Sequence, residues 1–433
     1  QIEITDSLKV PAGFPLSQPY WLRETPEKGQ FIVTDQQLIG LPENPPAMQV
    51  KYRLQFNEAP DVPVEIATPV MYRWVDPAIG ELYRPLAITP PVTANLAEQV
   101  YIYASKQPQE VSVLLRSHTN NVEGTLALDL PPGWQTTPES IKFSMAGTGQ
   151  EKQVKFTVTP PEKASAGRLT AVPTANGREW PYSLKVIDYP HIPVQTIFPP
   201  AEARIARLKI DTRRQLVGYI MGAGDAIPEA LRQIGYKVQL LEEGDFTPEN
   251  LQRYDAIIAG VRAYNTNGRL KVHQPKLMEY VKNGGNFIIQ YNTSFRLATE
   301  DLGPYPLQLS RDRVTVEEAP VKFLKPDHPV LNFPNRITQT DFDGWVQERG
   351  LYFPNEWSEE YEPILEMNDP GEDPKQGSLL TARYGKGTFV YTGLSFFREL
   401  PAGVPGAFRL FANLVEFGNK PAVKVKNEGS MNK

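Results

Sequence analysis

The 433-residue sequence contains no cysteine, and this absence excludes disulfide bonds, thiolate metal sites and a cysteine nucleophile. Its four histidines are too few to indicate a histidine-rich metal cluster, so we expect neither a metal nor a cofactor. No apolar run approaches the roughly 18 residues that a membrane-spanning helix needs. The net charge of −5 argues against a broad phosphate-binding surface. We therefore expect no membrane span and no nucleic-acid partner.

Proline is abundant instead, with 42 residues, which is about 10% of the chain and roughly twice the average usage. Many short strands bounded by prolines produce such a composition, because proline is tolerated at strand edges and turns. Hydrophobic residues make up 40% and charged residues 22%, as in ordinary globular proteins. The length suggests roughly two to four domains. Because the chain starts at Gln1 rather than methionine, we expect a processed product or a piece of a longer protein.

Residues 1–93 are expected to form a first β-sandwich. Strands are predicted at Gln30–Thr34, Met48–Phe56 and Val64–Trp74, which are rich in β-branched and aromatic residues. Apolar and polar residues alternate strictly along Met48–Phe56, and this period of two predicts one buried face and one solvated face.

Residues 94–195 are expected to form a second, Ig-like β-sandwich. Strand candidates recur there at near-regular spacing, at Gln99–Ala104, Glu110–Arg116, Gly124–Leu130, Glu151–Thr159 and Leu169–Pro173. The PPGW turn within Leu128–Pro138, the segment KQVKFTV and the following PEKASAG resemble the immunoglobulin-like module appended to bacterial α-galactosidases and other glycan-acting enzymes.

We expect residues 196–203 to form a proline-rich connector, residues 204–420 an α/β domain, and residues 421–433 a polar tail. In the α/β domain, short apolar runs alternate with helical patterns, which predicts a doubly wound parallel sheet. The strands are predicted at Leu216–Met221, Lys237–Leu241, Ala256–Val261, Asn286–Tyr291 and Gly387–Thr392, and the helices at Ile227–Ile234, around Leu277–Val281 and at Ala407–Phe417.

This α/β domain resembles the class I glutamine amidotransferase fold, which is flavodoxin-like, but its chemistry is missing. Asn292 in the segment Ile289–Ser294 stands where that family has its cysteine nucleophile, and an amide is not a nucleophile. The family motif F-H-P-E appears as Phe396–Glu399, so Phe397 replaces the general base. Ser294 stays open as a substitute nucleophile, although it lacks the glycines of a G-x-S-x-G elbow.

Two segments are candidates for ligand binding. The loop 260–267 follows a predicted strand at the edge where doubly wound sheets place ligands, and it contributes Arg262, Tyr264 and Asn265. A plain crossover loop is the alternative. Near the degenerate triad, we include Asn292, Arg398 and Glu399 as candidates.

The second segment, Thr340–Pro354, combines carboxylates with aromatic residues, as carbohydrate clefts do. If this segment is a strand, Asp341 and Asp343 point the same way. The segment also contains Trp345, Glu348, Arg349 and Tyr352. Of these, we predict Trp345, Glu348 and Arg349 as ligand-binding residues, together with Asp341 and Asp343. A structural loop held by an Asp343–Arg349 ion pair is the alternative.

Two further motifs favour turns over sites. Gly222–Asp225 lies between a predicted strand and helix, but Ile227 replaces the third glycine of a dinucleotide-binding motif. In Pro326–Pro329 we expect Asp327 to cap a backbone amide.

The order of these segments, from Met71–Thr93 through the Ig-like module to Asp341–Phe353 and Tyr384–Leu414, resembles the C-terminal portion of large bacterial PIG-L (LmbE-like) N-deacetylases. In that family an N-terminal zinc domain with an A-H-P-D-D-E motif removes N-acetyl groups from sugar-type substrates, and this chain has no such motif. The resemblance implies a non-catalytic accessory region whose partner is its own N-terminal deacetylase domain, with a glycan as possible ligand.

Two alternatives stay open. One is a glycan hydrolase with a relocated site that uses Asp341, Asp343 and Glu348, since paired carboxylates held about 5–9.5 Å apart can cleave glycosides. The other is a structural spacer. The absence of cysteine, the β-sandwich modules and the missing start methionine suit a periplasmic or extracellular bacterial protein, and they suit an excised cytoplasmic fragment nearly as well.

Overall fold

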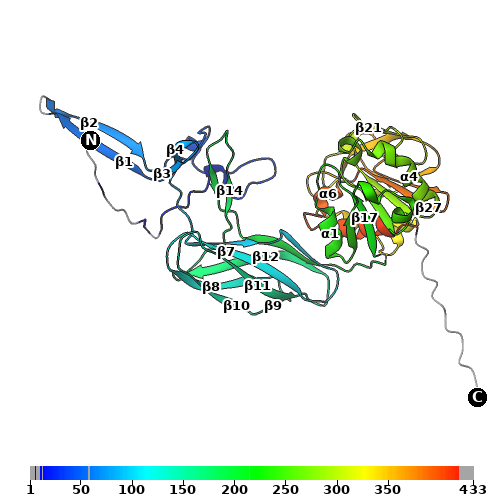
Figure 1. Ribbon diagram of the computed structural model, residues 1–433, viewed down its shortest axis with the longest axis horizontal. Coiled ribbons are helices and arrows are strands. Elements are labelled where there is room, and N and C mark those ends of the chain that lie inside the picture. Colours follow the sequence, from blue (N-terminus) through cyan, green and yellow to red (C-terminus); the bar gives the residue numbers. More distant parts are fainter. Residues whose placement is uncertain (1–4, 6–9, 12, 57–58, 214, 419–433) are drawn as a thin grey trace, which may run out of the picture. The chain divides into compact units, whose positions relative to one another are not determined.

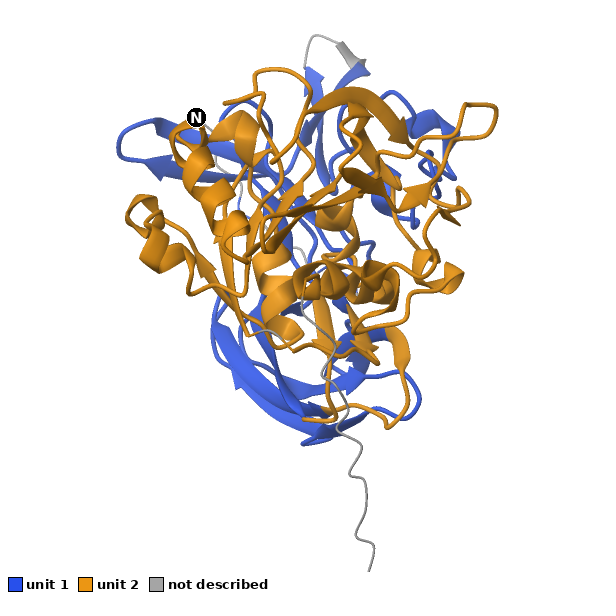
Figure 2. Ribbon diagram, turned by 90° about the vertical axis from the view of Figure 1, so that its right-hand side faces the viewer, with its two compact units in different colours: residues 1–98, 108–158, 168–203 blue, residues 99–107, 159–167, 204–433 orange. Residues whose placement is uncertain are grey.

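The computed structural model describes residue 5 and residues 10–11, 13–56, 59–213 and 215–418, so that the predicted polar tail at 421–433 lies outside the described residues. The chain divides into two compact units (Figure 2). Unit 1 consists of residues 1–98, 108–158 and 168–203, and unit 2 of residues 99–107, 159–167 and 204–433. No helix in the described part is both long and apolar enough to span a membrane.

Unit 1 contains two antiparallel sheets with an apolar interior. One sheet has the order β5 (Val92–Leu96), β7 (Gln109–Ser117), β11 (Glu151–Thr159) and β9 (Gln135–Thr137). In the other sheet β8 (Val122–Asp129) pairs with β10 (Ser140–Met145) and β12 (Ser165–Ala175). Along β7, Val111, Val113 and Leu115 are buried while the residues between them are more accessible. This alternation confirms the strands predicted for the second module and gives it its core.

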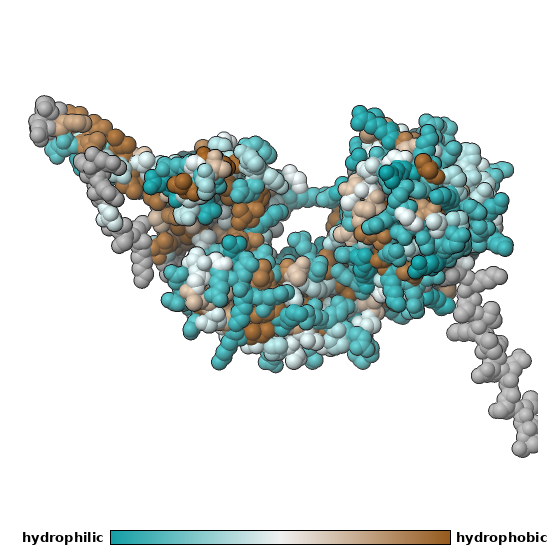
Figure 3. Space-filling view, viewed as in Figure 1, coloured by the Kyte–Doolittle hydropathy of each residue, from teal (hydrophilic) through white to brown (hydrophobic). Residues whose placement is uncertain are grey.

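The part of unit 1 before β5 differs from the predicted first sandwich. Its described residues form two separate hairpins, β1–β2 (Gln49–Phe56 and Ala59–Pro69) and β3–β4 (Met71–Asp76 and Gly80–Pro85). Residues 31–34 form no strand. All eight residues of β1 are exposed, and Figure 3 shows hydrophobic side chains on the surface of this hairpin. The alternation in β1 was correct evidence for a strand but wrong about burial, because no described element covers the apolar face.

Unit 2 is built on a seven-stranded sheet (Figure 1). The strand order is β18 (Lys237–Leu240), β17 (Leu216–Ile220), β19 (Ala256–Ala259), β20 (Asn286–Gln290), β27 (Gly387–Thr392), β26 (Leu379–Tyr384) and β24 (Tyr361–Pro363). The first five strands are parallel, and the last two are antiparallel additions at one edge. The five parallel strands confirm the strand positions predicted from the sequence.

Helices cover both faces of this sheet. Helices α1 (Ile227–Gln233) and α7 (Pro405–Glu416) belong to one apolar cluster, and α2 (Pro248–Leu251) and α4 (Leu270–Lys282) to the other. Neighbouring strand residues enter opposite clusters because side chains alternate along a strand: in β20, Ile288 packs in the first cluster and Phe287 in the second. This explains why the strands are continuous apolar runs, since both of their faces are buried.

Candidate functional site

The carboxyl ends of the parallel strands lie together at one edge of the unit 2 sheet. Loops that start at residues 260 and 291 follow β19 and β20 there, and residues 393–395 lead from β27 into α6 (Phe396–Glu399). Parallel strands expose the same end at the same edge, and this is where ligands bind in α/β proteins with helices on both faces of the sheet.

Asn292 holds two of these loops together. Its side chain is fully buried. The Oδ1 atom accepts a hydrogen bond from the backbone N–H of Tyr264 over 2.9 Å, and Nδ2 donates to the carbonyl of Gln290 over 2.9 Å. Asn292 therefore joins the end of β20 to the short helix α3 (Ala263–Thr266), and its amide offers no attacking atom.

Phe397 packs among aromatic and charged neighbours. Its ring centroid lies 5.1 Å from that of Tyr291, and the Arg398 guanidinium lies 4.8 Å from the Phe397 ring. Arg398 is paired with Glu348 over 2.9 Å. In the part of the chain that the structure describes, Ser294 makes no hydrogen bond to a histidine or carboxylate that could activate it.

Arg262 is held in a strained conformation beside these rings. Its φ of 56° lies in the left-handed region, which residues other than glycine, asparagine and aspartate seldom adopt. Its backbone N–H donates to the carbonyl of Tyr291 over 2.9 Å. Its Nε is buried and has no hydrogen-bond partner among the described residues. Burial raises the pKa of the Tyr291 hydroxyl, and the charges of Arg262 and Arg398 oppose that rise.

Tyr352 completes the group from a different part of the chain. It lies in β23 (Gly350–Trp357) with a φ of 53°, and its ring stacks on that of Tyr291 at 6.1 Å between centroids. Phe295, whose surface is 48% exposed, meets the Tyr352 ring edge-on at 6.4 Å. We refer to six residues as the edge cluster: Arg262, Tyr291, Phe295, Tyr352, Phe397 and Arg398.

The other residues predicted in the loop after β19 support this cluster from inside. Tyr264 is fully buried, its hydroxyl donates to Gln274, and burial raises its pKa. Asn265 donates through Nδ2 to the carbonyls of Thr293 and Phe295 over 3.2 and 3.0 Å. These contacts fix the loop that carries Phe295. Tyr264 and Asn265 therefore position the edge cluster, but they are less accessible to a ligand than Phe295 is.

Glu399 and Arg349 anchor the segment before β23. Glu399 is fully buried and accepts hydrogen bonds from the Val346 backbone N–H at 2.9 Å and from the Ser395 hydroxyl at 3.3 Å. Burial raises its pKa to about 8, so it is largely protonated near neutral pH. Arg349 donates to the carbonyls of Ala319 and Phe342. The predicted Asp343–Arg349 ion pair is thus not the contact that fixes this loop, and Asp343 is exposed.

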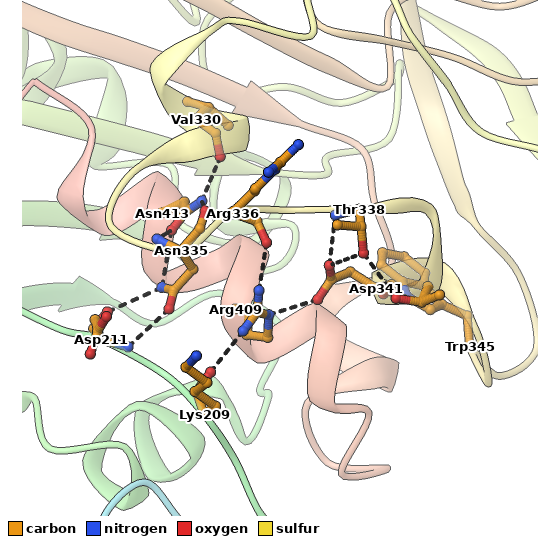
Figure 4. A network of polar contacts seen from close by, with 11 residues as sticks. Lys209, Asp211, Val330, Asn335, Arg336, Thr338, Asp341, Trp345, Arg409 and Asn413 are labelled. Carbon is orange, nitrogen blue, oxygen red and sulfur yellow. Dashed lines mark hydrogen bonds and ion pairs between the residues drawn. The ribbon is translucent and has the colours of Figure 1, made fainter. Parts of the chain in front are cut away.

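Asp341 and Trp345 belong to a structural network rather than to a strand (Figure 4). Residues Gln339–Phe342 form the 3₁₀-helix η4, which corrects the prediction that Asp341 and Asp343 alternate along an extended segment. Asp341 pairs with Arg409 over 2.7 Å and accepts from Thr338. Trp345 is 4% exposed and donates from Nε1 to the Asp341 carbonyl, so its ring packs in the core.

The turn Gly222–Asp225 contains no phosphate site. A Cβ atom on Gly222 would lie 2.1 Å from the carbonyl oxygen of Val261, so glycine is needed for the close approach of two loops. The Asp225 carboxylate accepts hydrogen bonds from the Ile227 and Val261 N–H groups over 3.1 and 3.2 Å. A carboxylate therefore occupies the start of α1, where a dinucleotide phosphate would bind.

The only Asp-His pair is also structural. The Nδ1 atom of His328 accepts from the Val330 N–H over 3.2 Å at the start of α5 (Pro329–Asn332), whereas Asp327, which we predicted as the cap, is exposed. Among the residues that the structure describes, no group of three or more His, Asp or Glu side chains could hold a metal ion.

Sequence reasoning missed Tyr291 and Phe295 as site residues, and it named Tyr352 only as one of the aromatic residues of the Thr340–Pro354 segment. Tyr291 and Tyr352 lie far apart in the sequence and belong to different segments of the fold, and the left-handed conformation of Tyr352 leaves no local signal. For Phe295, an aromatic residue in a loop directly after a buried strand was an available signal.

Comparisons with known proteins fit part of this picture. Residues 109–176 match the family model of the NPCBM-associated, NEW3 domain of alpha-galactosidase. This supports a carbohydrate-associated β-sandwich module in unit 1. No curated protein matches the chain.

The similar solved structures resemble the chain only weakly. Alpha-2-macroglobulin of E. coli is 13% identical with a TM-score of 0.19, and the match covers 34% of this chain and 9% of that one. A family 123 glycoside hydrolase from Clostridium perfringens is 8% identical with a TM-score of 0.18, covering 46% and 48%. WR4, an MSP family member of C. elegans, is 6% identical with a TM-score of 0.16, covering 27% and 95%.

Proposed function

We propose that this chain is a non-catalytic accessory region of a carbohydrate-acting bacterial protein, and that the edge cluster of unit 2 binds a glycan. The observation that carries the proposal is the pair Asn292 and Phe397. By the proposed resemblance they take the positions of a nucleophile and a base, and in the structure Asn292 connects two loops while Phe397 packs against Tyr291. Around them the chain offers rings and guanidinium groups, which bind sugars and do not attack them.

The finer features of the proposal rest on resemblance. The parallel strands of unit 2 follow the sequential order 2-1-3-4-5, which supports a flavodoxin-like, amidotransferase-like domain over residues 204–420. The module match in unit 1 supports the Ig-like domain proposed over residues 94–195. We propose a PIG-L-type N-deacetylase as the parent protein, a catalytic deacetylase domain as the partner of this region, and a periplasmic or extracellular location.

The relocated-hydrolase alternative is weaker. Asp341 forms an ion pair with Arg409 and takes part in the capping box of η4, and Glu348 forms an ion pair with Arg398. A carboxylate used as acid or base must be free to exchange a proton with a substrate.

The first test is a glycan array with the whole chain and two variants. Phe295→Ala removes the most exposed ring of the cluster, and we expect it to abolish binding. Arg262→Gly removes the guanidinium while relieving the left-handed backbone, so we expect lost binding with folding stability kept or raised. Val272→Ala, an exposed apolar residue outside the cluster, serves as the matched control and should bind like the parent.

The second test concerns catalysis. The purified chain is incubated with N-acetylated chitooligosaccharides and with glutamine, after metal stripping and after addition of zinc. We expect no turnover above buffer. Ordinary turnover of either substrate, or a wild-type array pattern for Phe295→Ala and Arg262→Gly together, would contradict the proposal.

A further inference from the structure

Unit 1 contains a concave site that shares no residue with the edge cluster. It is a cavity of about 290 Å³ between the β3–β4 hairpin, the end of β7 and the hairpin β14–β15 (Lys185–Ile187 and Gln195–Ile197). Its polar walls include Tyr72, Arg84, Arg116, His118 and the threonine hydroxyls. The volume lies at the lower end of the range for ligand sites, which fits a molecule of one or two sugar rings.

The charge of this cavity is one-sided. None of the lining residues that the structure describes is acidic, although the whole chain carries a net charge of −5. A neighbouring cavity of about 370 Å³ shares the wall at residues 85–87 but is lined by Arg23, Asp35 and Glu43, so its charges are mixed. The cavity with Arg84 and Arg116 is therefore the one of the two that attracts a negative group.

Arg84 is available to bind that group. It lies opposite Tyr72 in the β3–β4 register, and its guanidinium carbon is 4.8 Å from the centre of the Tyr72 ring. Arg84 forms no ion pair within the described part of the chain. A guanidinium stacked on a ring keeps its in-plane N–H donors free, and these donors match the two oxygens of a carboxylate.

Arg116 and His118 add donors from the other wall. Arg116 in β7 and His118 directly after this strand both line the cavity, whereas Ser117 between them is buried. Arg116 pairs with Glu151 only at 3.7 Å, and both side chains are about half exposed. The Nε2 atom of His118 lies 3.0 Å from the Thr93 hydroxyl, and burial, with Arg116 nearby, lowers its pKa to about 4. The ring is neutral at pH 7 and contributes hydrogen bonding without charge.

We infer that this cavity binds a small acidic saccharide, that is, a sugar ring that carries a carboxylate. The two arginines bind the carboxylate, Thr89 and Thr196 contact hydroxyls, and the apolar wall of Leu184, Val186 and Val194 packs against C–H groups. The inference rests on the proposed carbohydrate role, which it extends to unit 1. Three of the lining residues, Arg116, His118 and Thr148, fall inside the matched NEW3 module.

The test is titration of the whole chain with sodium D-glucuronate, D-glucose and sodium sulfate, followed by saturation-transfer NMR and calorimetry. We expect glucuronate to bind and glucose to bind at least about tenfold more weakly, because the charge-assisted hydrogen bonds are lost. Arg84→Ala and Arg116→Ala should each weaken glucuronate binding about tenfold or more, and Arg84→Lys should restore part of it. Arg73→Ala is the matched control, since Arg73 alternates to the other face of β3 and pairs with Glu81.

Three outcomes would overturn the inference. Glucose could bind as well as glucuronate, sulfate could match glucuronate with the same dependence on Arg84, or Arg73→Ala could cause an equal loss. The second of these would indicate a bare anion site. Phe295→Ala separates the two proposals: it should abolish array binding through unit 2 and leave glucuronate binding unchanged, so that either site can fail while the other stands.

Discussion

Asp341 offers the sharpest test of whether the Thr340–Pro354 segment is a cleft or a structural element. The change is Asp341→Asn, which keeps the size of the side chain and removes its charge. Asp341 lies at the meeting point of η4, Thr338 and α7, where its side chain is 8% and that of Arg409 is 22% exposed. If the network in Figure 4 is structural, the variant loses stability and keeps ligand binding.

The size of this loss follows from the contacts. Asp341 accepts from Arg409 at Oδ1 and from the Thr338 N–H and hydroxyl at Oδ2. Removing one partner of a buried ion pair costs about 3–5 kcal/mol. Asparagine keeps one acceptor but turns an amide N–H toward the Thr338 N–H, so we expect a loss of about 2–3 kcal/mol. For a domain of this size, that lowers the melting temperature by about 4–12 °C.

The assay is differential scanning calorimetry of both variants beside the glycan array. Asp343→Asn is the matched control, because Asp343 is exposed, lies two residues away and loses the same charge. It should change the melting temperature by less than about 2 °C. If Asp341→Asn is no less stable than Asp343→Asn, or loses glycan binding at full stability, the structural role of this network is refuted.

Other predictions concern burial and close packing. In the parent protein, stability should fall as the pH rises from about 4.5 to about 8, because folded Glu399 keeps a proton that the unfolded chain releases. Glu399→Gln should remove this fall, which melting temperatures of both proteins across the pH range would show; melting temperatures that change in parallel would contradict it. Gly406→Ala should lower the free energy of unfolding by about 1–3 kcal/mol although alanine favours helix, since its Cβ would lie 1.9 Å from the Asp341 carbonyl oxygen. Gly147→Ala, where no atom lies within 4 Å of the new Cβ, should leave the free energy of unfolding unchanged in urea titrations. Because Leu54 is 43% exposed, Leu54→Lys should change the free energy of unfolding by less than about 0.5 kcal/mol and should reduce self-association in size-exclusion chromatography. A clear loss of stability would show that this face of β1 is covered.

The strands of both units could be predicted where the order of apolar and polar residues along the strand is enough to identify it. The apolar runs of β19 and β20 and the alternation in β7 and β11 each reflect a burial pattern that the sequence carries by itself. The same reasoning failed on β1, because alternation reports which side chains share a face and not what covers that face. Strand β26 was missed, since its antiparallel pairing with β27 depends on a partner and not on its own residues.

The candidate site was predicted only in part for similar reasons. Arg262 follows from the rule that ligands bind at the carboxyl ends of the strands, whereas Arg398 became a candidate only through the resemblance of Phe396–Glu399 to a family motif. Asp341 and Asp343 were considered on an extended strand, although Thr338 and Asp341 have the spacing of a capping box, which predicts a helical turn. The contact of Tyr352 with Tyr291 could not be predicted, because it depends on tertiary packing and on a left-handed backbone that no local pattern encodes.

The backbone conformations bear on the choice between a binding region and a plain spacer. Arg262 and Tyr352 both hold positive φ angles at bulky side chains, and each such conformation costs of order 1–3 kcal/mol unless its surroundings enforce it. A spacer gains nothing from that cost, since glycine at either position would relieve it. Here the strained residues place the Tyr352 ring against the Tyr291 ring and leave the Arg262 Nε without a hydrogen-bond partner among the described residues. Side chains that are held rigid in this way lose less entropy when a ligand binds, so the strain favours the proposed binding surface over a spacer.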